Sequence, residues 1–233
     1  MQGSKCLKNV QLHSLKGSLR DIVTESDILA EAEIKQFLAL HYPFDRFVGE
    51  ESNQATVSNK YWICDPIDGT ANFVAGQSYY CCALAYMDNN KPIVGVVHAP
   101  KLNKLYWASI NYGAYVNASR LLPRSIQLCD TLIAVSIPSK TSEGLFKKIE
   151  KLNKISRGVL RLGSANLNIL QVCENTLGLA LGFQAPKWDI EPALAIAKIS
   201  GVNTLLYENA DGTCNYIVTK TEITDEIKSF LYD

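Results

Sequence analysis

Hydrophobic and polar positions follow a helical period over 24–42, near the start of the chain. Apolar side chains recur there every three or four residues. Those on one face are Ala30, Ile34, Phe37 and Leu38. Thr24 and Asp27 have the spacing of a capping pair, and Pro43 follows the end. The pattern therefore predicts a helix that begins at Thr24 and ends at Tyr42.

The remainder of the first half has the short apolar runs that are typical of strands. Strands are predicted over 61–64, 79–87, 93–98, 105–108 and 113–117. The run Asp88-Asn89-Asn90 is a favourable hairpin turn between two of them. The first half is therefore expected to contain an antiparallel sheet.

In the second half of the chain, segments with the helical period alternate with short apolar runs that are typical of strands. Strands are predicted over 132–136 and 177–183, and helices over 143–152, 165–176, 188–200 and 224–232. Gly201 stands where a helix C-terminal stop is expected. These elements predict a mixed α+β or α/β architecture, with a first part over 1–119 and a second part over 120–233.

Composition and charge narrow the classes of partner. The chain has 233 residues, of which 47% are hydrophobic, and its 23 basic residues equal its 23 acidic residues. The densest basic stretch, 147–154, contains Glu150 and is best explained as a solvated helix face. No apolar window reaches signal-peptide or transmembrane length. We therefore expect no nucleic-acid partner and no membrane insertion.

The cysteines indicate a reducing environment. Seven are present, an odd number, and no C-x-x-C motif occurs. Most lie within apolar runs, as buried free thiols do. This favours a cytoplasmic protein.

Paired carboxylates are the main candidate for chemistry. Asp65 and Asp68 follow an apolar strand and are separated by Pro66 and Ile67. Pro66 restricts the backbone and Gly69 permits a sharp turn, so both carboxylates can point at one place. Two anions there would repel each other unless a cation lay between them, and hard oxygen ligands suit Mg²⁺.

Further acidic residues occur at the ends of predicted elements. Glu50-Glu51 follows a glycine after an apolar strand, and Asp189 follows Trp188. Each has a simple structural explanation when taken alone. Asp27 can cap a helix, the Glu50-Glu51 pair can be a solvated turn, and Asp189 can begin a helix. Only their order and context together point to a common site.

Taken together, these blocks resemble the inositol monophosphatases and related lithium-sensitive phosphatases. The matching blocks are Val23-Thr24-Glu25-Ser26-Asp27, Gly49-Glu50-Glu51-Ser52, the run from Trp62 to Phe73, Gly95-Val96-Val97 with Pro100, Gly163-Ser164-Ala165, and Trp188-Asp189. The resemblance extends from Lys16 nearly to the end of the chain. It implies a layered α/β/α/β/α sandwich with a large antiparallel sheet, a smaller mixed sheet and the site between them. A homodimer is common in that family.

The resemblance also implies roles for individual residues. Two to three Mg²⁺ ions would be held by Glu50, Asp65, the Ile67 carbonyl, Asp68 and Asp189. Thr70 and Asp27 would take a proton from the attacking water, and Glu50 would take part in catalysis by helping to place a third, more weakly bound ion. Contacts to phosphate or substrate would come from Asp68, Gly69, Thr70, Gly163, Ser164, Ala165 and Asp189. Lys16 would either support the site electrostatically or lie at the surface.

Three departures from the family pattern bear on the first layer, with its dimer contacts, and on the substrate pocket. The lead before Lys16 is short, and Gly182 stands where inositol-directed members carry an acidic residue. Ile190-Glu191-Pro192 replaces small residues, and Glu191 is expected to face solvent rather than the pocket. The expected substrate is a small phosphorylated metabolite similar to an inositol monophosphate. Alternatives are fructose 1,6-bisphosphate, a 3′-phosphoadenosine nucleotide, or a regulatory binding role that retains the fold.

Overall fold

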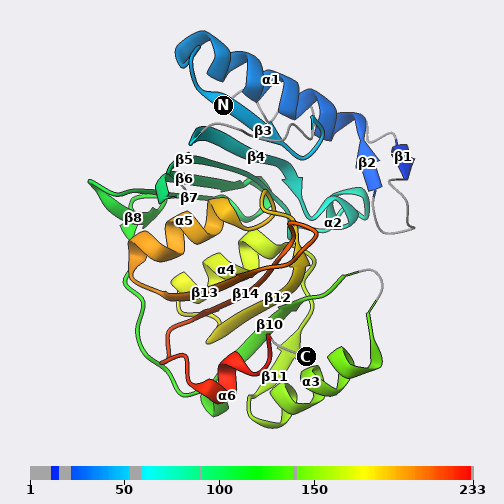
Figure 1. The fold of residues 1–233 in the computed structure, drawn as a ribbon, viewed down its shortest axis with the longest axis vertical. Coiled ribbons are helices and arrows are strands. Elements are labelled where there is room, and N and C mark those ends of the chain that lie inside the picture. Colours follow the sequence, from blue (N-terminus) through cyan, green and yellow to red (C-terminus); the bar gives the residue numbers. More distant parts are fainter. Residues whose placement is uncertain (1–11, 16–21, 53–58, 90, 139–140, 232–233) are drawn as a thin grey trace.

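Helices and sheets are stacked in alternating layers. The computed structural model describes residues 12–15, 22–52, 59–89, 91–138 and 141–231. Helix α1 (Glu25–His41) covers one face of a large sheet, and helices α4 (Ala165–Cys173) and α5 (Glu191–Ser200) separate that sheet from a smaller one. Helices α3 (Glu143–Lys154) and α6 (Asp225–Lys228) form the last layer (Figure 1). The expected layered sandwich is confirmed.

The large sheet contains the strands of the first half, in chain order from β3 to β9. Only β3 and β4 are parallel, and the other neighbours are antiparallel. Short 3₁₀ turns occur at Pro100–Leu102 and Leu128–Asp130. The strands are β3 (Arg46–Gly49), β4 (Lys60–Asp68), β5 (Cys81–Asp88), β6 (Lys91–Ala99), β7 (Lys104–Ser109), β8 (Gly113–Val116) and β9 (Ser119–Arg120).

The smaller sheet has the order β11-β10-β12-β14-β13 and is mixed. Its members are β10 (Leu132–Ser136), β11 (Gly158–Leu160), β12 (Leu179–Ala185), β13 (Asn203–Glu208) and β14 (Cys214–Thr219). The strands β13 and β14 were not predicted, although β14 is largely buried within this sheet. A separate two-stranded pair joins β1 (Leu12–Leu15) to β2 (Ile22–Thr24). The division of the chain at 119/120 stays a prediction.

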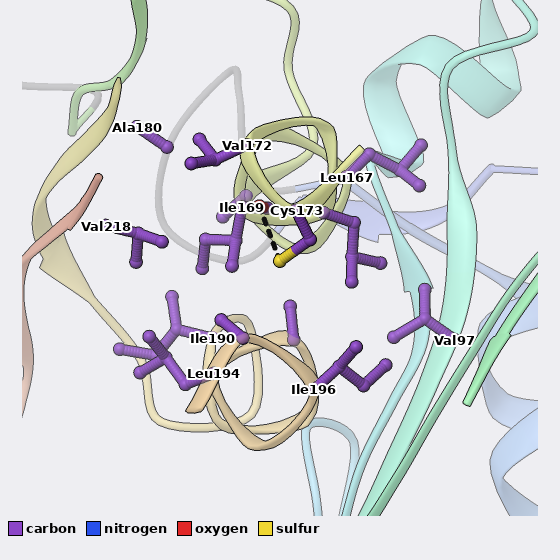
Figure 2. Close-up of a cluster of buried hydrophobic side chains, with 14 of the residues drawn as sticks. Val97, Leu167, Ile169, Val172, Cys173, Ala180, Ile190, Leu194, Ile196 and Val218 are labelled. Atoms are coloured by element: carbon purple, nitrogen blue, oxygen red, sulfur yellow. Dashed lines mark hydrogen bonds between the residues drawn. The ribbon is translucent and has the colours of Figure 1, made fainter. Parts of the chain in front are cut away.

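The main core fills the space between the two sheets. Figure 2 shows Ile169 and Val172 of α4 above Ile190 and Leu194, with Val97 of β6 at one side. Helix α5 approaches β6 so closely that a side-chain carbon at Gly95 would lie 2.7 Å from the Pro192 carbonyl oxygen. A second cluster packs α3 and α6 against the outer face of the smaller sheet. The burial of apolar surface on both sides of this sheet stabilises the stack.

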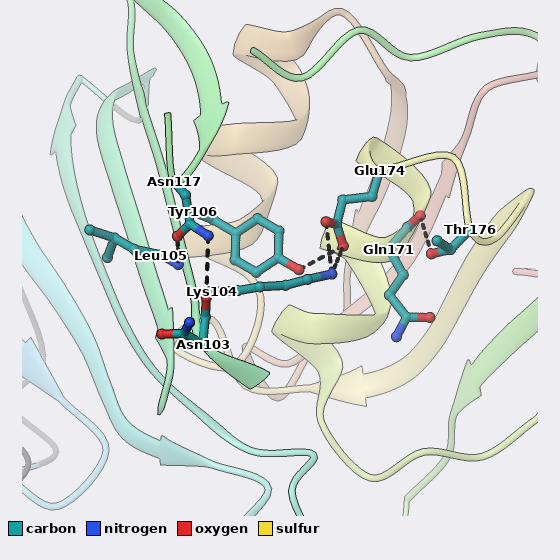
Figure 3. Close-up of polar contacts among 8 residues, drawn as sticks. All are labelled: Asn103, Lys104, Leu105, Tyr106, Asn117, Gln171, Glu174 and Thr176. Carbon is teal, nitrogen blue, oxygen red and sulfur yellow. Dashed lines mark hydrogen bonds and ion pairs between the residues drawn. The ribbon is translucent and has the colours of Figure 1, made fainter. Parts of the chain in front are cut away.

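A charged contact also joins the large sheet to α4. The Lys104 ammonium donates to both carboxylate oxygens of Glu174, at 2.8 and 2.7 Å, and the Tyr106 hydroxyl donates to Glu174 Oε2 at 2.7 Å. Figure 3 shows the lysine and the tyrosine converging on this one carboxylate. Glu174 is therefore an acidic residue whose charge is balanced within the protein.

Helix α1 begins as predicted, and its predicted face is buried in part. Thr24 and Asp27 form a capping box, which confirms the expected start. Phe37, expected on the buried face, is 59% exposed. The buried residues of the helix are Ser26, Asp27, Glu31 and Leu38. The prediction of the buried face is thus confirmed for Leu38 and wrong for Phe37, and α1 also buries the acidic side chains of Asp27 and Glu31.

Two further expectations concern the cysteines and membranes. Cys64, Cys81, Cys173 and Cys214 are buried free thiols, whereas Cys129 is exposed and Cys6 lies outside the described residues. Within the described ranges, no helix combines the length and apolar composition needed to cross a bilayer.

Candidate active site

The acidic motif lies at the end of β4. This strand continues through Pro66 to Asp68, further than the predicted run 61–64. Its pairing with β5 is irregular, since Asp65 is opposite Ala83 and Asp68 is opposite Cys81. An irregularity of this kind bends a strand and redirects its side chains. Both aspartates are buried at this bend.

Three carboxylates from separate segments meet beside it. Oxygens of Glu50, Asp65 and Asp189 all lie within 4.8 Å of one another. Glu50 directly follows β3 and is anchored by its backbone amide, which donates to the Cys64 carbonyl of β4 at 3.2 Å. Asp189 lies in the turn before α5, which begins at Glu191 rather than at the expected Trp188. The chain thus folds three of the predicted metal ligands into one group.

The environment of Asp65 is unfavourable for an unneutralised carboxylate. The residue is 1% exposed, and its Oδ1 atom has no hydrogen-bond partner among the described residues. Burial, followed by the neighbouring charges of Glu50, Asp68 and Asp189, raises the pKa of Asp65 well above its ordinary value. A buried oxygen without a donor, facing two other carboxylates, is suited to a hard cation such as Mg²⁺.

Asp68 has different partners although it is only three residues away. Its carboxylate accepts hydrogen bonds from Ser164 Oγ at 2.7 Å, the Ala165 amide at 3.1 Å and the Asn166 amide at 2.7 Å. These donors lie at the start of α4, where free amides and the helix dipole favour an anion. Burial raises the pKa of Asp68, while the bonds from Ser164 and Asn166 oppose the rise. Asp68 is therefore not one of the three clustered carboxylates.

Thr70 and Asp27 lie together, as the resemblance implies. Thr70 Oγ1 is 3.4 Å from Asp27 Oδ1 and 2.9 Å from the Ile67 carbonyl oxygen. Asp27 Oδ2 accepts from the backbone amide of Thr24 at 2.8 Å, which holds the carboxylate in place. Burial raises the pKa of Asp27, and the hydrogen bonds from Thr24 oppose the rise. The Thr70 hydroxyl can thus donate a hydrogen bond to either of two acceptors, of which only the Asp27 carboxylate can take up its proton.

Two glycines bring the halves of the site together. Gly69 has φ of 93° and precedes the short helix α2 (Thr70–Val74), as expected from its sequence. A side-chain carbon at Gly69 would lie 3.2 Å from the Gly163 carbonyl oxygen, and one at Gly163 would lie 2.8 Å from Asn72 Nδ2. Asn72 also donates to the Leu162 carbonyl at 2.8 Å. These contacts hold 162–164 against the β4–α2 turn.

The sequence did not single out a polar network on the other side of α4. Tyr216 Oη donates to Ser136 Oγ at 3.1 Å, Asn168 Nδ2 donates to the same oxygen at 3.2 Å, and Tyr79 Oη donates to Asn168 Oδ1 at 3.0 Å. Any side chain at Gly182 would overlap the ring of Tyr216. The site of the missing acidic residue is therefore filled by an aromatic ring from β14.

Two other expectations have different outcomes. Glu191 does not simply face solvent: it is partly buried, and the Tyr61 hydroxyl donates to its Oε2 at 3.4 Å. Burial raises the pKa of Glu191 to about 7. Lys16 lies outside the described residues.

Comparisons with known proteins agree with this geometry. The model of the inositol monophosphatase family matches residues 4–224. The fructose-1,6-bisphosphatase/inositol-1-monophosphatase of Thermotoga maritima is 31% identical over 215 residues, covering 91% of this chain and 83% of the relative. A lithium chloride-soaked inhibitory complex of a staphylococcal inositol monophosphatase-1 superposes with a TM-score of 0.85 at 25% identity, covering 98% and 88% of the two chains. An IMPase/NADP phosphatase with Mg²⁺ and phosphate superposes with a TM-score of 0.84 at 26% identity, covering 96% and 87%.

The layered fold and the carboxylate-rich site at the strand ends are those of enzymes that hydrolyse phosphoric monoesters. The match spans nearly all of the sequence. The chain belongs to the inositol monophosphatase family.

Proposed function

We propose that the protein is a Mg²⁺-dependent phosphatase that hydrolyses a small phosphorylated metabolite, most similar to an inositol monophosphate. The observation that carries this proposal is the group formed by Glu50, Asp65 and Asp189, in which a buried Asp65 oxygen lacks a hydrogen-bond donor from the part of the chain that the structure describes. Carboxylates this close together repel one another unless a cation binds between them.

Glu50, Asp65 and Asp189 would hold the ion. The Ile67 carbonyl and Asp68 would contribute to the two or three ions that the resemblance implies. When bound, Mg²⁺ supplies positive charge that stabilises the transferring phosphoryl group and lowers the pKa of a coordinated water.

The remaining steps use side chains of the chain itself. Thr70 Oγ1 would accept a proton from the attacking water while it transfers its own proton to Asp27 Oδ1, 3.4 Å away. The water oxygen forms a bond to phosphorus as the bond to the alcohol oxygen breaks, and the departing alkoxide takes a proton from solvent. Since burial raises the pKa of Asp27, this carboxylate is a better proton acceptor than an exposed aspartate.

The residue at position 182 bears on substrate choice. The Tyr216 ring covers Gly182 and excludes a carboxylate from that place. Without an acidic residue at position 182, one fixed negative charge fewer would oppose a leaving group that carries a second phosphate. Relatives named as fructose-1,6-bisphosphatase and as NADP phosphatase make a sugar bisphosphate and a phosphorylated adenosine nucleotide the two alternatives to test.

Phosphate release from a panel of esters tests the proposal. The panel contains inositol 1-phosphate, fructose 1,6-bisphosphate, a 3′-phosphoadenosine nucleotide, NADP and glycerol 2-phosphate, each with Mg²⁺ or with a chelator. We expect Mg²⁺-dependent turnover that Asp65→Asn and Asp68→Asn abolish and that Glu174→Gln retains. Turnover that persists in chelator, or in Asp65→Asn, would contradict the metal assignment.

Three finer properties stay predictions. Inhibition of turnover by millimolar Li⁺ tests lithium sensitivity, and sedimentation equilibrium tests the expected homodimer. Fractionation of the source cells tests the cytoplasmic location.

A further inference from the structure

Glu31 is a buried acidic residue that the proposed mechanism does not use. It is 4% exposed and lies on α1, one turn after Asp27, so both side chains project from the same face of the helix. Glutamate is almost never this buried without a partner. The partner of Glu31 therefore indicates its role.

Glu31 contacts the turn that follows β3 at two points. Its Oε2 atom accepts a hydrogen bond from the Glu51 backbone amide at 2.8 Å. Its carboxylate also lies directly over Gly49, where any side-chain carbon would overlap Oε2 and Cδ and would come within 2.7 Å of Oε1. Because φ of Gly49 is not in the left-handed region, glycine is required here for space alone.

Glu50 is the residue between these two contacts. Its backbone amide donates to the Cys64 carbonyl, and its side chain joins the group with Asp65 and Asp189. The backbone of the turn is therefore held from the β4 side at Glu50 and from the α1 side at its two neighbours. A backbone held on both sides leaves the Glu50 side chain fewer conformations to lose when it binds a ligand.

We infer that Glu31 is a positioning residue for the cation site: it fastens the 49–51 turn to α1 and thereby directs the Glu50 carboxylate toward Asp65 and Asp189. This inference rests on the proposed function, because it assigns the site a cation. Removal of a residue that orients a metal ligand typically weakens metal affinity about 10- to 100-fold.

Four variants and one control separate this role from a general loss of structure. Mg²⁺ affinity is measured by calorimetry on Glu31→Ala, Glu31→Gln, Gly49→Ala and the double variant that combines Glu31→Ala with Gly49→Ala. The control is Glu33→Ala, at an exposed position of the same helix. We expect at least a tenfold weaker affinity in Glu31→Ala and in Gly49→Ala. Glu31→Gln keeps an oxygen acceptor and should lose no more than about threefold.

The double variant is the sharpest comparison. Once Glu31 is alanine, a methyl group at position 49 meets no carboxylate, so Gly49→Ala should add little further loss. Residues that act through one contact show this kind of non-additivity. Wild-type affinity in Glu31→Ala, or fully additive losses in the double variant, would overturn the inference.

Two further measurements keep the test independent of catalysis. In a chelator, backbone amide exchange in the peptide over 46–52 should be faster in Glu31→Ala and unchanged in Glu33→Ala. In turnover assays, the half-saturating Mg²⁺ concentration should rise while kcat at saturating Mg²⁺ stays within about threefold of wild type. A wild-type protein that binds no Mg²⁺ would contradict the proposed function, and unchanged exchange in Glu31→Ala would contradict the positioning role.

Discussion

Asp65 and Asp68 belong to the same strand, are both buried and are three residues apart, yet they have opposite surroundings. Asp65 has an oxygen that no donor among the described residues contacts, and it faces two other carboxylates. Asp68 accepts hydrogen bonds from three donors at the start of α4. The first aspartate is the one at which we propose that a cation binds, whereas the second joins the large sheet to a helix of the inner layer.

Glu174 extends this comparison to a residue outside the site. Its carboxylate is neutralised by Lys104 and bound by Tyr106. Three acidic residues therefore show three solutions to one electrostatic problem: an added cation, a helix N-terminus and a side-chain cation. Of the three, Asp65 is the residue with an oxygen that no donor within the described ranges contacts, so this oxygen can bind Mg²⁺ without the loss of a hydrogen bond.

The largest effect is expected from Asp65→Asn. The amide oxygen is neutral and a much weaker ligand than a carboxylate, so we expect about a 1000-fold loss of kcat at saturating substrate, which corresponds to about 4 kcal/mol. Phosphate release and Mg²⁺ calorimetry provide the measurement. Retention of more than a tenth of the wild-type rate would show that Asp65 is not a metal ligand.

A second, smaller effect concerns the stability of the metal-free protein. Asp68→Asn places an NH₂ group among donors at the start of α4 and should lower the free energy of unfolding by about 1–2 kcal/mol. Asp65→Asn removes a carboxylate that its acidic neighbours repel, so it should raise the free energy of unfolding. Urea unfolding in a chelator gives both values, and a shift of the same sign in the two variants would remove the distinction between them.

The pH dependence should separate the two aspartates further. The pKa of Asp65 in the folded protein is raised above its value in the unfolded chain, so the folded state binds more protons. The stability that this group contributes is present below about pH 4, the ordinary range of aspartate, and is lost as pH rises through the raised pKa. Thermal unfolding in chelator from pH 4 to pH 8 should show this decline, with at most about 1.4 kcal/mol per pH unit for one proton.

Two comparisons identify the source of that decline. Asp65→Asn should flatten the profile, and added Mg²⁺ should reverse the decline because it stabilises the ionised form. A wild-type profile that is independent of pH in chelator would contradict the assigned direction of the pKa shift.

The smallest effect is expected at Glu174, whose carboxylate is paired with the Lys104 ammonium. Glu174→Gln retains acceptor geometry for Tyr106 but loses the charge that pairs with Lys104, which is itself partly exposed. We expect a loss of about 1 kcal/mol in the free energy of unfolding and no change in Mg²⁺ affinity. The double variant with Lys104→Met isolates the coupling energy, and a change in Mg²⁺ affinity would connect this contact to the site.

The sequence by itself determined the local features of this protein. The capping pair at Thr24, the turn at Gly69 and the strand over 132–136 depend on a few neighbouring residues, and the structure confirms each of them. The order of the acidic blocks was enough to indicate the family. It was not enough to reveal β13 and β14, whose short apolar runs are separated by the turn-rich segment 209–213.

Only the tertiary structure decided which of the acidic side chains meet. Glu50 and Asp65 come from the ends of neighbouring strands of the large sheet and Asp189 from the turn before α5, so their distances follow from how α5 packs against that sheet. The roles of Glu31 and Tyr216 were also hidden, because each depends on a glycine distant in sequence whose missing side chain leaves room for it. Periodicity and spacing describe one segment at a time, whereas close packing between segments is a property of the folded chain.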